Sequence, residues 1–305
     1  MAEALIFPGQ GAQHEGMGRD WCGAFPAARA TFEEASGALG FSISEACWSR
    51  GEQVHRTDIA QPGILTTSAA IVRVLIERGL DPASAPMAAG LSLGEYTALW
   101  FAGSLEFRDA LRLVRVRGEA MQEASEEVPS GMVSLLGAGE DQARALAEVG
   151  SRAGICSVAN LNAPGQVIVS GELAALDAVE AAAKEHGVRR TRRLQVAGGF
   201  HSECMRSAAR RLRVALEEVE IREPRVRFVT NVTGEAVKEP ERIREFLAAQ
   251  VCSPVLWEKS VRGALASGVR EFLEPGPGRV LSGLMEKIEP AARVRAVTTP
   301  ADLEG

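Results

Sequence analysis

The stretch PMAAGLSLGEY at residues 86–96 gives the clearest indication of the fold. Residues 86–89 form a short apolar run typical of a buried strand, and a helical pattern resumes at about residue 94. Between them lies Gly-x-Ser-x-Gly at 90–94, and this strand–turn–helix placement is typical of a nucleophile elbow. Ser92 would stand at a helix N-terminus, where the amide of Leu93 can point at a developing oxyanion. The alternative interpretation is a glycine-rich turn with an ordinary N-cap serine.

An α/β pattern extends on both sides of this segment. An apolar run at 5–7 predicts a strand that ends in the loop Pro-Gly-Gln-Gly at 8–11, where Gln10 could supply a second oxyanion donor. Amphipathic helices are expected at about 25–39, 61–78, 94–101 and 106–124. Further helices at about 202–219, 240–251, 256–267 and 278–287, with a strand at 269–273, complete the chain.

The pattern changes between about residues 128 and 197. Strand, helix, strand, strand, helix and strand are predicted in that order, at 132–136, 139–149, 155–159, 166–170, 172–186 and 188–194. This order is typical of a ferredoxin-like unit. The sequence therefore predicts an α/β fold in which residues 1–127 and 198–305 form a large catalytic subdomain. A small ferredoxin-like α+β subdomain is inserted at 128–197.

Composition excludes several classes of function. The 305 residues carry 34 Lys and Arg against 40 Asp and Glu, and this net charge of −6 argues against a nucleic-acid-binding surface. No apolar run approaches about 18 residues, so no membrane span is expected. Five cysteines without a CxxC pair indicate reduced thiols and a cytoplasmic protein. No metal site is expected, because HExxH is absent and His201, Glu203 and Cys204 are too close in sequence for a usual zinc site.

A serine nucleophile needs a base, and the chain offers four histidines. His201 lies in Gly-Gly-Phe-His-Ser at 198–202, where a predicted strand ends and a helix begins. That is a loop position at the end of the sheet, where α/β active sites form. His14, His55 and His186 lie in a glycine-rich loop, a polar segment and the end of an exposed helix. His201 is therefore the candidate base, and a structural or surface histidine is the alternative.

Arg117 differs from the other arginines of its predicted helix. At about 100° per residue, Arg108, Arg112 and Arg115 share a solvated face, whereas Arg117 points the opposite way among apolar residues. Arginine is rarely buried without a partner. Arg117 could form an internal salt bridge, or it could bind a substrate carboxylate. A second basic run at 189–193, with Arg189 and Arg190, is either a solvated face or a phosphate site.

These residues lie in motifs that run almost the whole length of the chain, and with them it resembles the malonyl-CoA:acyl carrier protein transacylases. The motifs are FPGQGAQ at 7–13, Gln-Pro at 61–62, GLSLGEY at 90–96, the Arg117 helix, NAPGQVIVSG at 162–171, FHS at 200–202, NVTG at 231–234, QVCSPVLW at 250–257 and EPGPGRVLSGL at 274–284. One position departs from the family pattern, because Leu91 stands where most members have histidine.

The resemblance implies a hydrolase-like α/β core and ping-pong transfer of malonyl from malonyl-CoA to the thiol of a phosphopantetheinylated acyl carrier protein. Ser92 would be the nucleophile and His201 its base, oriented by the main-chain carbonyl of Gln250. The amides of Gln10 and Leu93 would form the oxyanion hole, and Arg117 would bind the malonyl carboxylate. The substrate pocket would include Gln61, Met121, Asn162 and Phe200. We expect no bound cofactor and a monomer that meets its carrier transiently.

Three other functions are weighed against this one. Gly-Leu-Ser-Leu-Gly also resembles stand-alone acyltransferases that serve polyketide synthases in trans, with the same chemistry. An acyl-thioester hydrolase on the same scaffold would not need a carboxylate-binding arginine, so Arg117 argues against it. A carrier-binding module without catalysis would not need Ser92 and His201.

Overall fold

The computed structural model describes residues 3–49 and 51–304. In this part of the chain the main sheet has six strands in the order β10-β9-β1-β2-β7-β8. Their bounds are β1 (Ala4–Phe7), β2 (Ala88–Gly90), β7 (Phe228–Val229), β8 (Ala236–Val237), β9 (Glu271–Pro275) and β10 (Arg293–Val297). Neighbouring strands are parallel except for β8, which is antiparallel to β7.

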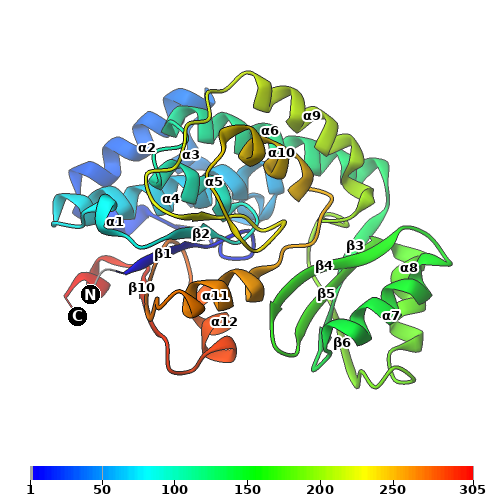
Figure 1. The fold of residues 1–305 in the computed structure, drawn as a ribbon. Helices are drawn as coiled ribbons and strands as arrows, with labels where there is room; N and C mark the ends of the chain where they lie inside the picture. The colour runs from blue at the N-terminus through cyan, green and yellow to red at the C-terminus, as the bar shows by residue number, and fades with distance from the viewer. Residues whose placement is uncertain (1–2, 50, 305) are drawn as a thin grey trace.

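Helices cover both faces of this sheet (Figure 1). One side holds α1 (Arg19–Ala24), α2 (Pro26–Leu39), α3 (Ile43–Trp48), α4 (Thr57–Glu77), α5 (Gly94–Phe101), α6 (Phe107–Glu127), α9 (Arg206–Glu217) and α10 (Pro240–Gln250). The other side holds α11 (Trp257–Ala266) and α12 (Val280–Ile288). Side chains alternate across a strand, so Leu5 and Phe7 of β1 enter the first core while Ala4 and Ile6 enter the second. This burial on both faces explains the continuous apolar run at 4–7.

A second sheet lies to the right of the main sheet in Figure 1, with α7 (Glu140–Ser151) and α8 (Leu173–Ala182) on its outer face. Its strands are β3 (Ser130–Leu136), β4 (Cys156–Ala163), β5 (Gln166–Glu172) and β6 (Arg190–Arg193). They pair antiparallel in the order β4-β5-β3-β6, which is the ferredoxin-like arrangement. The predicted fold class, an α/β core with a separate α+β sheet, is confirmed. The exact subdomain boundaries stay a prediction.

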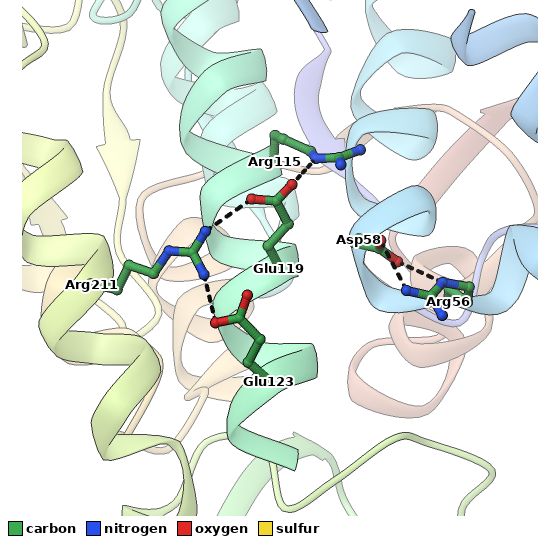
Figure 2. A network of polar contacts seen from close by, with 6 residues as sticks. All are labelled: Arg56, Asp58, Arg115, Glu119, Glu123 and Arg211. Atoms are coloured by element: carbon green, nitrogen blue, oxygen red, sulfur yellow. Dashed lines mark hydrogen bonds and ion pairs between the residues drawn. The ribbon is translucent and has the colours of Figure 1, made fainter. Parts of the chain in front are cut away.

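Two neighbouring helices, α6 and α9, position the segments that contain Arg117 and His201. Arg117 lies on α6, and α9 follows the loop that contains His201. Arg211 of α9 donates to Glu119 and Glu123 of α6, at 3.0 and 2.7 Å (Figure 2). These ion pairs link the surfaces of α9 and α6.

The helix α4 is long and apolar enough to cross a membrane by length and composition, but 83% of its most apolar window is buried inside the protein. It is therefore the core helix of this fold. It begins at Thr57, four residues before the predicted start at 61, and contains Pro62. The short elements α1, α3, β7, β8 and β10 were not predicted from the sequence.

Candidate active site

The turn between β2 and α5 is a strained strand-to-helix elbow with Ser92 at its apex. Ser92 has a positive φ of 52°, which is uncommon for a residue other than glycine. A Cβ at Gly90 would lie 1.9 Å from the main chain of Gly94, and one at Gly94 would lie 2.1 Å from the carbonyl oxygen of Phe7. Only glycine fits at either end of the motif, so the close packing of strand and helix explains both glycines.

Ser92 and His201 form a hydrogen-bonded pair. The Oγ atom of Ser92 lies 2.8 Å from Nε2 of His201, and Nδ1 of His201 lies 2.8 Å from the main-chain oxygen of Gln250. A carbonyl oxygen only accepts, so Nδ1 carries the proton and Nε2 is free to accept the serine proton. Burial, and then the charge of Arg117, lower the pKa of His201 to about 4. The imidazole is therefore neutral and able to act as a base at pH 7.

The guanidinium of Arg117 is buried beside the serine. It donates to Gln61 Oε1 at 2.7 Å, Ser92 Oγ at 2.9 Å and Gln250 Oε1 at 3.0 Å. Its Nε atom has no hydrogen-bond partner in residues 3–49 and 51–304, and the three acceptors of its other nitrogens are amide and hydroxyl oxygens, not carboxylates. Burial lowers its pKa, but an arginine stays protonated in a protein. The site therefore holds a cation without a directly paired anion.

A buried network behind the serine was missed by the sequence reasoning. Asn231 Oδ1 accepts from the main-chain N–H of Ser92 at 2.6 Å, and Asn231 Nδ2 donates to the carbonyl oxygen of Gly90 at 2.7 Å. Glu95 accepts from the main-chain N–H of Asn231 at 2.6 Å and from Nε2 of Gln250. Burial raises the pKa of Glu95 to about 7, although these hydrogen bonds oppose the rise. Its members lie in the motifs GLSLGEY at 90–96, NVTG at 231–234 and QVCSPVLW at 250–257, but only Gln250 was assigned a role from the sequence.

Two main-chain amides next to the serine remain available for an oxyanion. The N–H of Ser92 is already bound to Asn231. The N–H groups of Leu93 and Gln10, in contrast, donate to no acceptor in the part of the chain that the structure describes. Unpaired amides at an elbow are the usual donors to a tetrahedral oxyanion.

A cleft of about 620 Å³ opens from this elbow toward the antiparallel sheet. Most of the predicted site residues line it, namely Gln10, Ser92, Arg117, Met121, Asn162, Phe200 and His201. Gln61 and Gln250 lie behind Arg117 and hold it. The Oδ1 atom of Asn162 is buried without a hydrogen-bond partner among the described residues, so it can accept from a ligand. Leu91 also lines the cleft.

Of the basic run at 189–193, Arg192 lines the cleft. Arg189 and Arg190 are exposed and lie outside the lining. Alternation along β6 turns Arg193 to the other face, where it pairs with Asp177 and Glu180 of α8.

Two further observations concern the rest of the surface. Within residues 3–49 and 51–304, no group of three or more His, Cys, Asp or Glu side chains could hold a metal ion. A second open cleft of similar volume lies among α1, α2 and α3, lined by residues such as Arg19, Phe32 and Trp48. It contains none of the predicted site residues.

Comparison with known proteins agrees with this geometry. Residues 4–290 match the family described as acyl transferase domain. The chain is 38% identical over 303 residues to the malonyl CoA-acyl carrier protein transacylase of Bacillus subtilis, covering 99% of this chain and 95% of that protein. The Escherichia coli enzyme of the same name is 38% identical over 301 residues, covering 98% of this chain and 96% of that protein.

Solved structures give the same result. The malonyl CoA-acyl carrier protein transacylase of Clostridium perfringens has a TM-score of 0.94 at 37% identity, covering 100% of this chain and 95% of that chain. A malonyl-transacylase in complex with its type II PKS acyl-carrier protein has a TM-score of 0.94 at 37% identity, covering 100% and 98%. The chain belongs to the malonyl CoA-acyl carrier protein transacylase family of acyl transferases.

Proposed function

We propose that this protein transfers the malonyl group of malonyl-CoA to the phosphopantetheine thiol of a holo-acyl carrier protein. The observation that carries this proposal is Arg117, a buried cation without a directly paired carboxylate, 2.9 Å from the nucleophilic oxygen of Ser92. A hydrolase of simple acyl thioesters has no use for such a group, whereas a malonyl group brings a free carboxylate to it. The names of the similar enzymes support the same substrate and carrier.

In the first half-reaction, Ser92 Oγ attacks the thioester carbonyl carbon while His201 Nε2 takes the serine proton. The amides of Leu93 and Gln10 stabilise the tetrahedral oxyanion. The carbon–sulfur bond then breaks, and coenzyme A leaves as a thiol after His201 returns the proton to its sulfur. The product is a malonyl ester on Ser92.

The second half-reaction runs the same steps in reverse with a different thiol. His201 Nε2 takes the proton of the carrier thiol, and the sulfur attacks the ester carbonyl of the malonyl-serine. The bond to Ser92 Oγ breaks, and the serine oxygen recovers its proton from His201. The carbonyl oxygen of Gln250 keeps the imidazole in the required tautomer throughout, since it accepts from Nδ1 at 2.8 Å.

Selectivity for malonyl is assigned to Arg117 and to the apolar wall of the cleft. The guanidinium can receive the carboxylate in a bidentate manner. Phe200 and Met121 are both buried and line the cleft, and the phenyl ring of Phe200 would crowd a substituent on C2 of the substrate. We assign the phosphate groups of coenzyme A or carrier to Arg192, with Arg189 and Arg190 as more distant contributors.

The reaction serves primary fatty-acid synthesis or polyketide synthesis in trans, and Leu91 in Gly-Leu-Ser-Leu-Gly is the feature shared with stand-alone acyltransferases of the second kind. We further propose that the protein is monomeric and that it is cytoplasmic, the latter supported by five free cysteines. Residues 128–197 would form the small subdomain, which brings Asn162 and Arg192 to the cleft.

The test is to mix the protein with malonyl-CoA, with and without holo-carrier. Malonyl-carrier should accumulate only when the carrier is present, and free malonate should form slowly. Malonate release at the same rate with and without carrier would instead identify a thioester hydrolase. No reaction and no acyl-enzyme would favour a carrier-binding module.

A further inference from the structure

Glu95 is a buried carboxylate that the reaction steps above do not use. Its side chain is 0% exposed, and both of its oxygens accept hydrogen bonds. One oxygen accepts from the main-chain N–H of Asn231 at 2.6 Å, and the other accepts from Nε2 of Gln250. Asn231 holds the N–H of Ser92 at 2.6 Å, and Gln250 Nε2 donates to the carbonyl oxygen of Ser92 at 3.0 Å. Glu95 therefore supports the elbow from two segments distant in sequence.

The side-chain amide of Gln250 can be oriented in only one way between its two charged neighbours. Arginine only donates hydrogen bonds and an ionised carboxylate only accepts them. The amide oxygen must therefore face Arg117, whose Nη2 donates to it at 3.0 Å, and the amide nitrogen must face Glu95. A flipped amide would place two donors together at Arg117 and two acceptors together at Glu95.

From this geometry we infer that Glu95 is a positioning residue for malonyl recognition. Its carboxylate locks the Gln250 amide so that the amide oxygen holds the guanidinium of Arg117 toward Ser92 Oγ. The inference rests on the proposed function, since it concerns how the same site selects a carboxylated acyl group. Glu95 would thus contribute to malonyl selectivity although it contacts neither the substrate nor Ser92 Oγ.

A neutral amide at position 95 removes the carboxylate oxygen that accepts from Nε2 of Gln250. In a Glu95→Gln variant the single oxygen would accept from Asn231 N–H, and the new NH₂ group would face Gln250. Two NH₂ groups would then meet, because the carbonyl oxygen of Ser92 also accepts from Gln250 Nε2 at 3.0 Å, and their repulsion would displace the Gln250 amide from Arg117. Arg117 would lose one of its fixed acceptors and its aim at the serine.

The charge of Glu95 itself changes in an accessible pH range. The groups that face it from the packed elements are Arg117 of α6, Gln250 of α10, and Thr230 and Asn231 after β7, and Tyr96 is next to it on α5. Burial raises the pKa of Glu95 to about 7, so the lock weakens as pH falls through that value. His201 and Tyr96 stay neutral over this range, because burial lowers the pKa of His201 to about 4 and raises that of Tyr96.

The experiment measures kcat/KM for acylation by malonyl-CoA and by acetyl-CoA, and follows their ratio. Both substrates use Ser92 and His201, so effects on the dyad cancel in the ratio. Glu95→Gln should lower the malonyl:acetyl ratio roughly 10- to 100-fold, as expected for one lost hydrogen bond to a charged group. Glu274→Gln is the matched control and should leave the ratio unchanged. Glu274 is equally buried, but it caps the N-terminus of α12 through Leu281 and Ser282.

The wild-type protein provides a second, independent readout. Its malonyl:acetyl ratio should fall as pH is lowered from about 8 to about 6, whereas the ratio of Glu95→Gln should stay flat. Equal loss of both acylations in the variant, or a wild-type ratio that does not change with pH, would overturn the inference. If the wild-type protein formed no malonyl-enzyme at all, this result would contradict the proposed function itself and not only the role of Glu95. The pH profile decides the matter even if the variant does not fold.

Discussion

Replacing Arg117 by alanine should reduce the malonyl activity far more than the acetyl activity. Arg117 is 1% exposed, so a malonyl carboxylate that reaches its guanidinium is taken out of water as well. Breaking a buried ion pair by removing one partner costs about 3–5 kcal/mol, because the remaining charge is left uncompensated. At about 1.4 kcal/mol per tenfold, kcat/KM for malonyl-CoA should fall between roughly a hundredfold and a few thousandfold.

The acetyl group carries no charge, so its transfer should lose only what Arg117 contributes by holding Ser92 Oγ. That contribution is one hydrogen bond at 2.9 Å, which corresponds to about tenfold. The assay is the rate of acyl-enzyme formation with each acyl-CoA at saturating and subsaturating concentration. Arg115→Ala is the control, since Arg115 lies on the same helix and pairs with Glu119 at the surface. Equal losses for malonyl and acetyl would mean that Arg117 only supports the fold.

Three further predictions concern the base, the packing and the phosphate site. With acetyl-CoA as substrate, acylation should decline only as pH falls through about 4, because burial lowers the pKa of His201 to that value; an acid limb near 6.5 would contradict this. Gly118→Ala should destabilise the protein by about 1–3 kcal/mol in urea unfolding, because its Cβ would lie 2.8 Å from the main chain of α4. Gly37→Ala, which meets nothing within 4 Å, should instead stabilise by up to about 1 kcal/mol. Arg192→Glu should raise KM for malonyl-CoA more than Arg189→Glu does, since only Arg192 lines the cleft. A larger increase in KM for Arg189→Glu than for Arg192→Glu would instead assign phosphate binding to Arg189.

The sequence could predict the elbow because its determinants are local. A short apolar run, two glycines and a serine occupy nine consecutive residues, and both glycines are required by contacts within that turn and with the adjacent strand. Arg117 could be recognised because its neighbours on the same face of the predicted helix are apolar, whereas the other arginines of that helix share the opposite face. The ferredoxin-like order was also predictable, since three of its four strands are seven or eight residues long and its helices are amphipathic, so both have clear periods.

Glu95 could not be recognised in the same way. An acidic residue in the first turn of a helix is ordinary on a protein surface, where it interacts favourably with the helix dipole. Its burial depends on Asn231 and Gln250, which are 136 and 155 positions away. The same limit applies to Arg192, because a run of four arginines does not say which one faces a cleft. The two-residue strand β7 is too short to have a period.

Formation of a malonyl ester on Ser92 is the step on which the proposed function depends most directly. Radiolabelled malonyl-CoA should label the protein, and digestion should place the label on the peptide that contains Ser92. The label should leave when holo-carrier is added, and the Ser92→Ala variant should take up none. Label that persists in the variant, or label on the wild-type protein that cannot be passed to a carrier, would contradict transfer through Ser92.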